Sequence, residues 1–164
     1  MSTLVAYASK HGATEGIARA ITDRLCDRGV EAEARPVHDL HGLDGVDAVV
    51  VGSAIYAGSW MKDAMSFVHS FAPAMRPLPV WLFSSGPLGT EVKDDDEQPK
   101  QLEELRELLE PEGHVVFFGA LDPEELGFSE RMIIKAVRAP SGDFRDWEAI
   151  RGWADGIAET LNAA

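Results

Sequence analysis

The feature that most constrains the fold is a regular alternation of short apolar runs with longer amphipathic segments. We predict five strands, at residues 3–8, 30–37, 46–51, 78–83 and 115–118. All except 30–37 are mostly apolar and too short for helices, which is typical of strands buried on both faces. Segment 30–37 alternates apolar and polar residues and contains Pro36, as a strand at the edge of a sheet tolerates.

Helical periodicity fills the intervals between the predicted strands. Apolar residues recur every three or four positions, which predicts helices at 13–28, 59–71, 99–109, 129–137 and 146–161. Strands that alternate with helices through short connections form parallel sheets with helices on both faces. We therefore expect an α/β fold, a doubly wound five-stranded parallel sheet of order 2-1-3-4-5. The length of 164 residues fits a single domain, 1–164.

In such a sheet a ligand binds outside the carboxyl ends of the strands, so the loops after strands one, three and four are the candidate sites. The first loop precedes the helix at 13–28, whose free N–H groups and dipole favour a phosphate. Gly12 lets the backbone come close, the hydroxyls of Ser9 and Thr14 can donate hydrogen bonds, and Lys10 adds positive charge. The alternative is plain capping of the helix by Ser9 or Thr14. The predicted phosphate loop is Ser9, Lys10, His11, Gly12, Ala13 and Thr14.

The other two loops suit a flat ring. Small residues flank Tyr56 in the second loop, and either Tyr56 or Trp60 offers a stacking face; alternatively, both pack the start of the following helix. The third loop can hydrogen-bond the polar edge of a ring through its backbone, or it is an ordinary turn. The predicted ring-binding residues are Ser53, Ala54, Ile55, Tyr56, Ala57 and Gly58, together with Ser84, Ser85, Gly86, Pro87, Leu88 and Gly89.

Other phosphate-binding and metal-binding classes are disfavoured by motif. The chain has neither a G-x-x-x-x-G-K-[ST] sequence nor a G-x-G-x-x-G after the first strand. Strands one and three end in Ala8-Ser9 and Gly52-Ser53, without the carboxylates that hold Mg²⁺ in receiver domains. The acidic tract 94–97 is expected to be a solvated loop, and the single cysteine, Cys26, is expected to be a buried small hydrophobe. We expect no metal site.

The net charge of -13 disfavours nucleic acid and anionic membrane surfaces as partners, and it would suit a basic protein partner. No apolar stretch approaches the ~20 residues that span a bilayer. No signal peptide is visible at the amino terminus. A cytoplasmic protein without stable membrane insertion is expected.

The three loops resemble those of the flavodoxin family. The phosphate loop is similar to the T-x-T-G-x-T pattern, with His11 where Thr or Ser is usual. Residues 51–58, and later stretches at 118–121, 131–135 and 146–148, resemble the menaquinone-dependent protoporphyrinogen oxidase branch. The resemblance implies a flavodoxin-like fold with non-covalent FMN, its phosphate on Ser9–Thr14 and its ring between Ser53–Gly58 and Ser84–Gly89.

Three functional hypotheses remain. The first is an FMN-dependent oxidoreductase of the protoporphyrinogen oxidase type, with porphyrinogen or a quinone as substrate. The second is an electron carrier that docks a redox partner protein. The acidic surface favours it, and so does the segment 141–147, which is shorter than in the oxidase branch. The third is a flavodoxin-fold domain without flavin. No catalytic side chain is predicted, since His11 and His38 are expected at the surface and flavin chemistry needs mainly placement and electrostatics from the protein.

Overall fold

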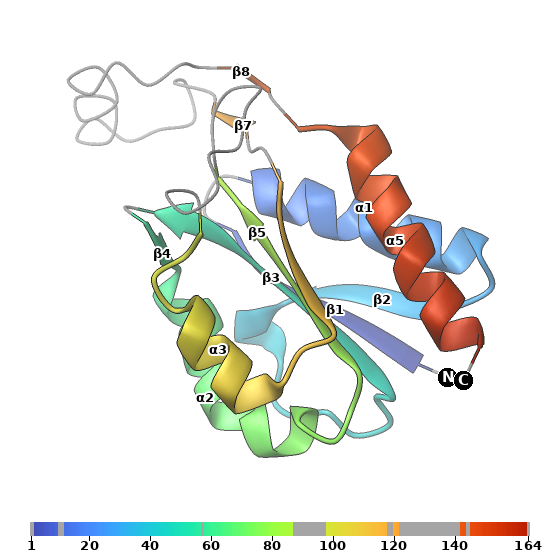
Figure 1. Ribbon diagram of the computed structural model, residues 1–164, viewed down its shortest axis with the longest axis horizontal. Coiled ribbons are helices and arrows are strands. Elements are labelled where there is room, and N and C mark those ends of the chain that lie inside the picture. The colour runs from blue at the N-terminus through green and yellow to red at the C-terminus, as the bar shows by residue number, and fades with distance from the viewer. Residues whose placement is uncertain are drawn as a thin grey trace.

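The structure is a computed structural model, which describes residues 2–9, 12–56, 58–86, 98–117, 120–121, 142–143 and 145–163. Its main sheet has the strand order β2-β1-β3-β5-β6, and all neighbours in this order are parallel (Figure 1). Because the short β4 stands off this path, the five long strands follow the predicted order 2-1-3-4-5. The strands are β1 (Ser2–Ala8), β2 (Glu31–Pro36), β3 (Ala48–Tyr56), β5 (Val80–Ser85) and β6 (Gly113–Phe117).

Helices cover both faces of the sheet, as predicted. α1 (Ala13–Asp27) and α5 (Trp147–Asn162) lie side by side on one face, and α2 (Lys62–Met75) and α3 (Leu102–Leu109) lie on the other (Figure 1). Each pair of helices packs against one face of the sheet and forms a separate hydrophobic core with it. Smaller elements are a 3-10 turn, η1 (Val37–Asp39), and an antiparallel pair, β7 (Ala120–Leu121) with β8 (Gly142–Asp143).

The burial of the strands follows their place in the sheet. β1, β3 and β5 are buried over most of their length, as strands covered on both faces must be. In β2 partly buried residues alternate with exposed ones, and the strand ends the order, which agrees with Pro36 marking an edge. Within the central strands, the ring of Phe83 occupies the space that a Cβ on Gly52 would need. Glycine at position 52 therefore makes room for the largest fully buried side chain.

The predicted helix at 59–71 begins later and ends later in the structure. Ser59–Trp60 form the short strand β4, which pairs antiparallel with the end of β3, Ile55 opposite Trp60. Gly58 has a φ of 80°, so it can make the tight turn of this hairpin. α2 then starts at Lys62 and continues to Met75, beyond the predicted end. The helix predicted at 129–137 lies outside the described residues.

Cys26 is exposed, so the expectation that it is buried is wrong. It lies in the last turn of α1, where the neighbouring Leu25 takes the fully buried side of the helix. The Cys26 thiol donates to the carbonyl of Ala32 at 3.6 Å, at the start of β2. The spacing of apolar residues therefore predicted the helix correctly, but it did not predict which of these residues lie on its buried face.

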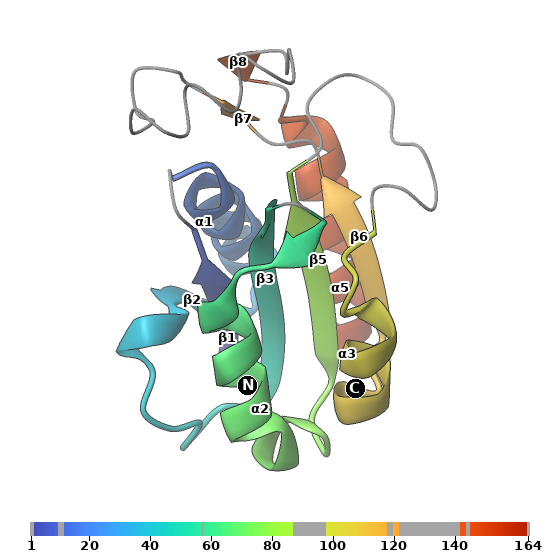
Figure 2. The same cartoon turned by 90° about the vertical axis from the view of Figure 1, so that its left-hand side faces the viewer.

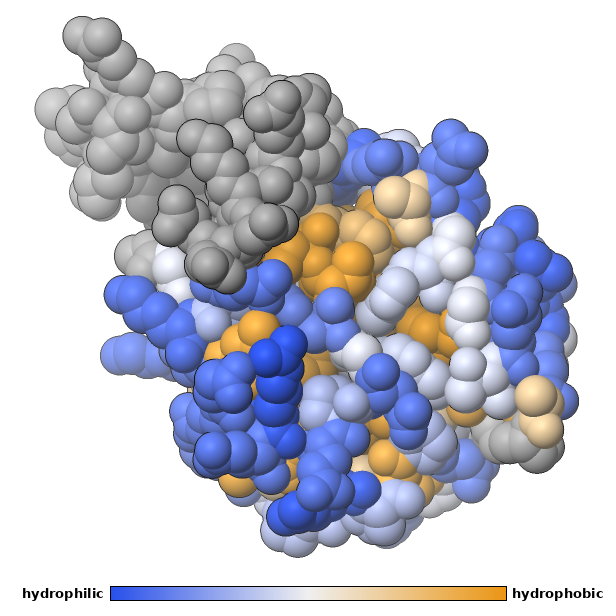
Figure 3. All heavy atoms as spheres, in the orientation of Figure 1, coloured by the Kyte–Doolittle hydropathy of each residue, from blue (hydrophilic) through white to orange (hydrophobic). Residues whose placement is uncertain are grey.

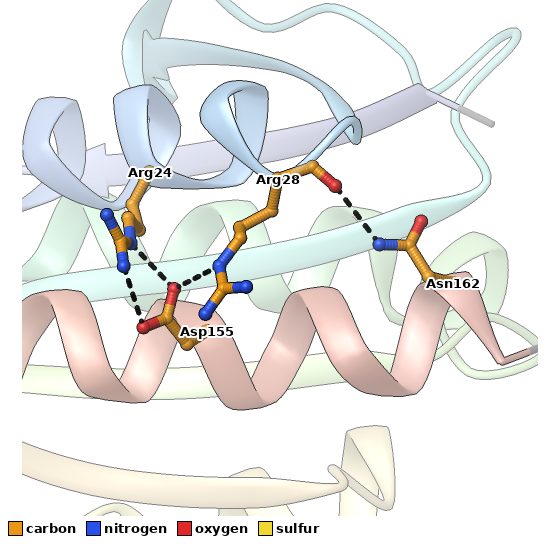
Figure 4. Close-up of polar contacts among 4 residues, drawn as sticks. All are labelled: Arg24, Arg28, Asp155 and Asn162. Carbon is orange, nitrogen blue, oxygen red and sulfur yellow. Dashed lines mark hydrogen bonds and ion pairs between the residues drawn. The ribbon is translucent and has the colours of Figure 1, made fainter.

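A set of polar contacts fixes α5 against α1 (Figure 4). The Asp155 carboxylate accepts from Arg24 Nε at 2.6 Å and from Arg28 Nε at 2.9 Å. Further along, Asn162 donates from Nδ2 to the carbonyl of Arg28 at 3.1 Å. α5 is therefore tied to the second half of α1 by charge as well as by apolar packing.

Hydrophilic side chains occupy much of the face drawn in Figure 3, with apolar side chains showing between them. This surface fits the strongly acidic composition, with a net charge of -13. Among the described residues, no helix is long and apolar enough to cross a membrane. The same residues contain no group of three or more His, Cys, Asp or Glu side chains arranged for a metal ion.

Candidate functional site

The carboxyl ends of the parallel strands meet at one end of the molecule, where α1 also begins (Figure 2). β1 leads into the turn before α1, β3 into the hairpin with β4, and β5 into residue 86. The three loops selected from the sequence therefore start at the same end of the sheet. This shared placement follows from the parallel pairing alone.

The turn before α1 is shaped by Gly12. This residue has a φ of 87°, a left-handed conformation that glycine adopts without the cost of a Cβ. Its N–H donates to Ser9 Oγ at 3.0 Å, so Ser9 closes the turn rather than capping the helix. No side chain in the described part of the chain caps the first turn of α1, whose amide groups thus keep their capacity to bind an anion.

Of the other residues of this loop, two belong to α1 and two lie outside the described residues. Thr14 is only 1% exposed, and Ala13 is the first residue of α1. Lys10 and His11 lie outside the described residues. The nearby Glu15 carboxylate accepts from the Tyr7 hydroxyl at 2.9 Å and from Arg19 at 3.2 Å, and these hydrogen bonds lower its pKa. The negative charge in the first turn of α1 is therefore already engaged.

The second loop presents Tyr56 and buries Trp60. Tyr56 ends β3 with 41% of its surface exposed, whereas Trp60 in β4 is only 3% exposed. Ser53 is fully buried, and its Oγ accepts from the Met61 N–H at 3.0 Å, which ties the two ends of the hairpin together. Of the two aromatics considered from the sequence, Tyr56 is the exposed one.

Trp60 is held by a buried hydrogen-bond chain. Its Nε1–H donates to Ser84 Oγ at 2.8 Å, and the same oxygen lies 2.8 Å from His114 Nε2 on β6. Burial, and to a smaller extent the charge of Arg106, lowers the pKa of His114 to about 4. His114 is therefore neutral at pH 7, and its Nε2 can accept the Ser84 hydroxyl proton while that oxygen accepts from Trp60.

The described start of the third loop, residues 84–86, lies directly against the second loop. Ser84 and Ser85 are buried, and a Cβ on Gly86 would stand 3.1 Å from the carbonyl oxygen of Ile55. The Gly86 N–H donates to the Phe117 carbonyl at 3.3 Å. Glycine at position 86 thus allows the third loop to leave the sheet close beside the second. Pro87, Leu88 and Gly89 lie outside the described residues, as does Ala57 of the second loop.

Two residues before α3 support the hairpin from the side. The Lys100 N–H donates to the Gly58 carbonyl at 2.9 Å, and Gln101 Oε1 accepts from the Trp60 N–H at 3.1 Å. Sequence reasoning missed these residues, and it also missed His114. Nothing in their local sequence signals the role, because their partners lie about 40 positions earlier for Lys100 and Gln101, and 30 earlier for His114.

The structure thus brings twelve of the eighteen predicted site residues to one end of the sheet, and the other six lie outside the described residues. Their roles as cofactor ligands remain predictions. The twelve are Ser9, Gly12, Ala13, Thr14, Ser53, Ala54, Ile55, Tyr56, Gly58, Ser84, Ser85 and Gly86.

Several known proteins align with this chain along nearly its whole length. The chain is 25% identical over 174 aligned positions to the protoporphyrinogen IX dehydrogenase [quinone] of Escherichia coli (strain K12), covering 96% of this chain and 95% of that protein. A flavodoxin structure from the domain Archaea aligns with a TM-score of 0.64 at 18% identity, covering 99% of both chains. The Streptococcus pneumoniae TIGR4 flavodoxin aligns with a TM-score of 0.65 at 19% identity, also over 99% of both chains.

These structural likenesses agree with the observed fold. The family model described as "Flavodoxin domain" matches residues 4–147, which include all of the loops. Membership of that family implies a flavin cofactor. The chain belongs to the flavodoxin domain family.

Proposed function

We propose that this chain binds FMN at the carboxyl ends of β1, β3 and β5 and acts as an FMN-dependent oxidoreductase of the protoporphyrinogen IX dehydrogenase type, with a quinone as electron acceptor. The observation that carries the flavin site is the uncapped first turn of α1 together with the exposed residue Tyr56, both at the carboxyl end of the sheet. The reaction type rests on the similarity to the quinone-dependent dehydrogenase, which extends along 96% of the chain.

The first loop fits the phosphate of FMN. Amide groups of an uncapped helix start, together with the positive end of the helix dipole, stabilise a phosphate. Gly12 adds space, because nothing in the described structure lies within 4 Å of where its Cβ would stand. Ser9 Oγ accepts from Gly12, which leaves the Ser9 hydroxyl proton for the ligand.

The second and third loops fit the isoalloxazine ring. Tyr56 offers its exposed face for stacking, whereas the face of Trp60 is buried and its Nε1–H is engaged by Ser84. Gly58 and Gly86 let the two loops pack closely, because a Cβ would stand 3.3 Å from Lys100 Cε at position 58 and 3.1 Å from Ile55 at position 86. FMN bound here supplies the electron-transfer chemistry, and the loops hold and orient its ring.

A second candidate function is that of an electron carrier. The net charge of -13 favours it, because an acidic surface attracts and orients a basic redox partner.

Titration of the flavin-free chain with FMN tests the cofactor. We expect quenching of flavin fluorescence at one FMN per chain. Gly12→Ala places a Cβ on a left-handed residue, costs about 1–2 kcal/mol and distorts the loop, so FMN binding should weaken. Gly29→Ala is the matched control, because Gly29 has a similar φ of 83°, equally open space and a position at the far end of α1. A chain that does not quench FMN, or equal FMN affinity in both variants, would contradict the proposed site.

Turnover separates the two functions. The FMN-loaded chain should oxidise protoporphyrinogen IX with a menaquinone analogue as acceptor, and Tyr56→Ala should lower this rate together with the FMN affinity. A loaded chain that exchanges electrons with a basic redox protein, but does not oxidise the porphyrinogen, would overturn the enzyme and leave the carrier. The measurements are absorbance of the porphyrin product and of the partner protein.

A further inference from the structure

A cation lies against the first turn of α1, and it comes from the opposite end of the chain. Arg145 directly precedes α5, and its Nη1 stands 3.5 Å from the carbonyl of Ala13. Its guanidinium carbon lies 4.7 Å from the centre of the Trp147 ring, at a cation–π distance. α1 and α5 run side by side on this face of the sheet (Figure 1), and the contact with Ala13 places Arg145 at the start of α1.

Glycine in the first turn of α1 creates the space for this contact. A Cβ on Gly16 would stand only 2.6 Å from Arg145 Nη1, closer than two such atoms approach. Glycine inside a helix is less stable than alanine, so its presence here has a local cost. The guanidinium occupies the space that the missing Cβ leaves.

The start of α5 holds the backbone of Arg145 in place from the other side. Asp146 caps that helix, and its Oδ1 accepts from the Ala149 N–H at 3.0 Å. Trp147, in the first turn of α5, is partly buried in the core shared by α1 and α5. The Trp147 ring, the Ala13 carbonyl and the gap at Gly16 therefore contribute to the position of the guanidinium.

The guanidinium and the amides of the first turn of α1 are hydrogen-bond donors on the same part of the helix. The amino-terminal end of a helix carries partial positive charge, which favours anions. A phosphate at this end can accept from the amides of the first turn and from the guanidinium together. Arginine also matches the planar, multi-donor geometry that phosphate recognition uses.

We propose that Arg145 determines the specificity of this site for a phosphorylated flavin, by donating to the FMN phosphate alongside the first turn of α1. The inference rests on the proposed FMN site and adds to it a phosphate ligand from outside the phosphate loop. Arg145 acts on the phosphate only, so it contributes nothing to the binding of riboflavin, which has the same ring and no phosphate.

The test compares FMN and riboflavin in three variants of the flavin-free chain, by fluorescence quenching. Arg145→Gln removes the charge, and its FMN dissociation constant should rise about tenfold, the loss typical of one charge-assisted hydrogen bond. Its riboflavin affinity should stay within about twofold of the wild type. Arg151→Gln, a change of an exposed arginine on the same helix α5, is the matched control and should alter neither affinity.

Gly16→Ala tests the same contact without touching the arginine. The added Cβ displaces the guanidinium, so FMN should bind more weakly and riboflavin should not. Alanine is the better helix former, so thermal unfolding of this variant should occur at the same temperature or higher. A fall in FMN affinity without a fall in stability separates the phosphate contact from a general weakening of the fold.

Two results overturn the inference while leaving the proposed function intact. One is a wild-type FMN affinity in Arg145→Gln, and the other is an equal loss of FMN and riboflavin affinity, which would indicate a purely structural role. A wild-type chain that binds neither flavin overturns the proposed function, and this inference with it. The wild-type titration therefore distinguishes the two failures.

Discussion

His114 is a residue whose protonation is controlled by the fold. Its ordinary pKa is near 6.5, and burial, helped by Arg106, lowers it to about 4 in the folded chain. Between these two values the unfolded chain binds a proton that the folded chain does not, so folding should lose stability as the pH falls from about 6.5 to about 4. Above pH 6.5 both states are neutral and this contribution is constant.

The structural reason lies in the Ser84 hydroxyl. A protonated His114 would donate from Nε2 to the same oxygen that already accepts from Trp60 Nε1, and the hydroxyl proton would lose its acceptor. A complete effect over this pH range would be about 3 kcal/mol, and partial exposure of His114 reduces it to about 1–2 kcal/mol. Urea unfolding at pH 7 and pH 4.5 should show a smaller acid loss in His114→Gln than in the wild type. Parallel losses would contradict this role of His114.

Single residues also mark the limit of predicting the site from sequence. The sequence marks Gly12 as a position where the backbone can come close to a ligand, and the structure adds a left-handed φ of 87° that the sequence did not predict. Tyr56 and Trp60 are equivalent in the sequence, and only the pairing of β3 with β4 exposes the first and buries the second. Arg145 gives no local signal, because its contact with Ala13 spans 132 positions.

Among the elements, α1 and α5 depend on each other through one carboxylate. The hydrogen bonds from Arg24, and then from Arg28, hold the pKa of the Asp155 carboxyl well below its usual range. Because the folded pKa is lowered, this stabilisation is present at neutral pH and is lost only as strong acid protonates Asp155. Asp155→Asn should lower the unfolding temperature at pH 7 by about 2–4 °C, and less at 1 M salt, where exposed charges are screened.

The control for this prediction is an ion pair within a single helix. Glu103 pairs with Arg106 at 2.8 Å in α3, and its side chain is 80% exposed. Glu103→Gln should leave the unfolding temperature almost unchanged, since exposed pairs contribute little. Calorimetry of both variants at low and high salt measures the difference. Equal small shifts in the two variants would mean that Asp155 does not join the helices.

Helices and strands were predictable from the sequence where the pattern of apolar residues fitted only one type of secondary structure. The apolar runs of β1, β3 and β5 are buried on both faces, and no other element fits so short an apolar segment. The pattern failed at residues 59–60, where Trp60 extends the helical periodicity of α2 but pairs with Ile55 as a strand. A turn at Gly58 decides that outcome, and its positive φ is a property of tertiary pairing that the sequence does not display.

At the scale of the whole molecule, the acidic charge opposes the binding of the cofactor that the site is proposed to hold. The net charge is -13, and the phosphate of FMN carries a charge of about -2 at neutral pH. At low salt the field of the whole chain reaches the approaching anion, whereas at 0.1 M salt it is screened beyond about 10 Å. Local donors such as the first turn of α1 act only after the ligand has arrived.

The rate of FMN association should therefore rise with salt, by about two- to tenfold between 10 and 200 mM, since screening removes a long-range repulsion. Riboflavin, which is neutral, should associate at a rate that salt does not change. Stopped-flow quenching of flavin fluorescence measures both rates on the same flavin-free chain. An FMN rate that falls with salt would mean that positive groups at the carboxyl ends of the strands outweigh the net charge of the molecule.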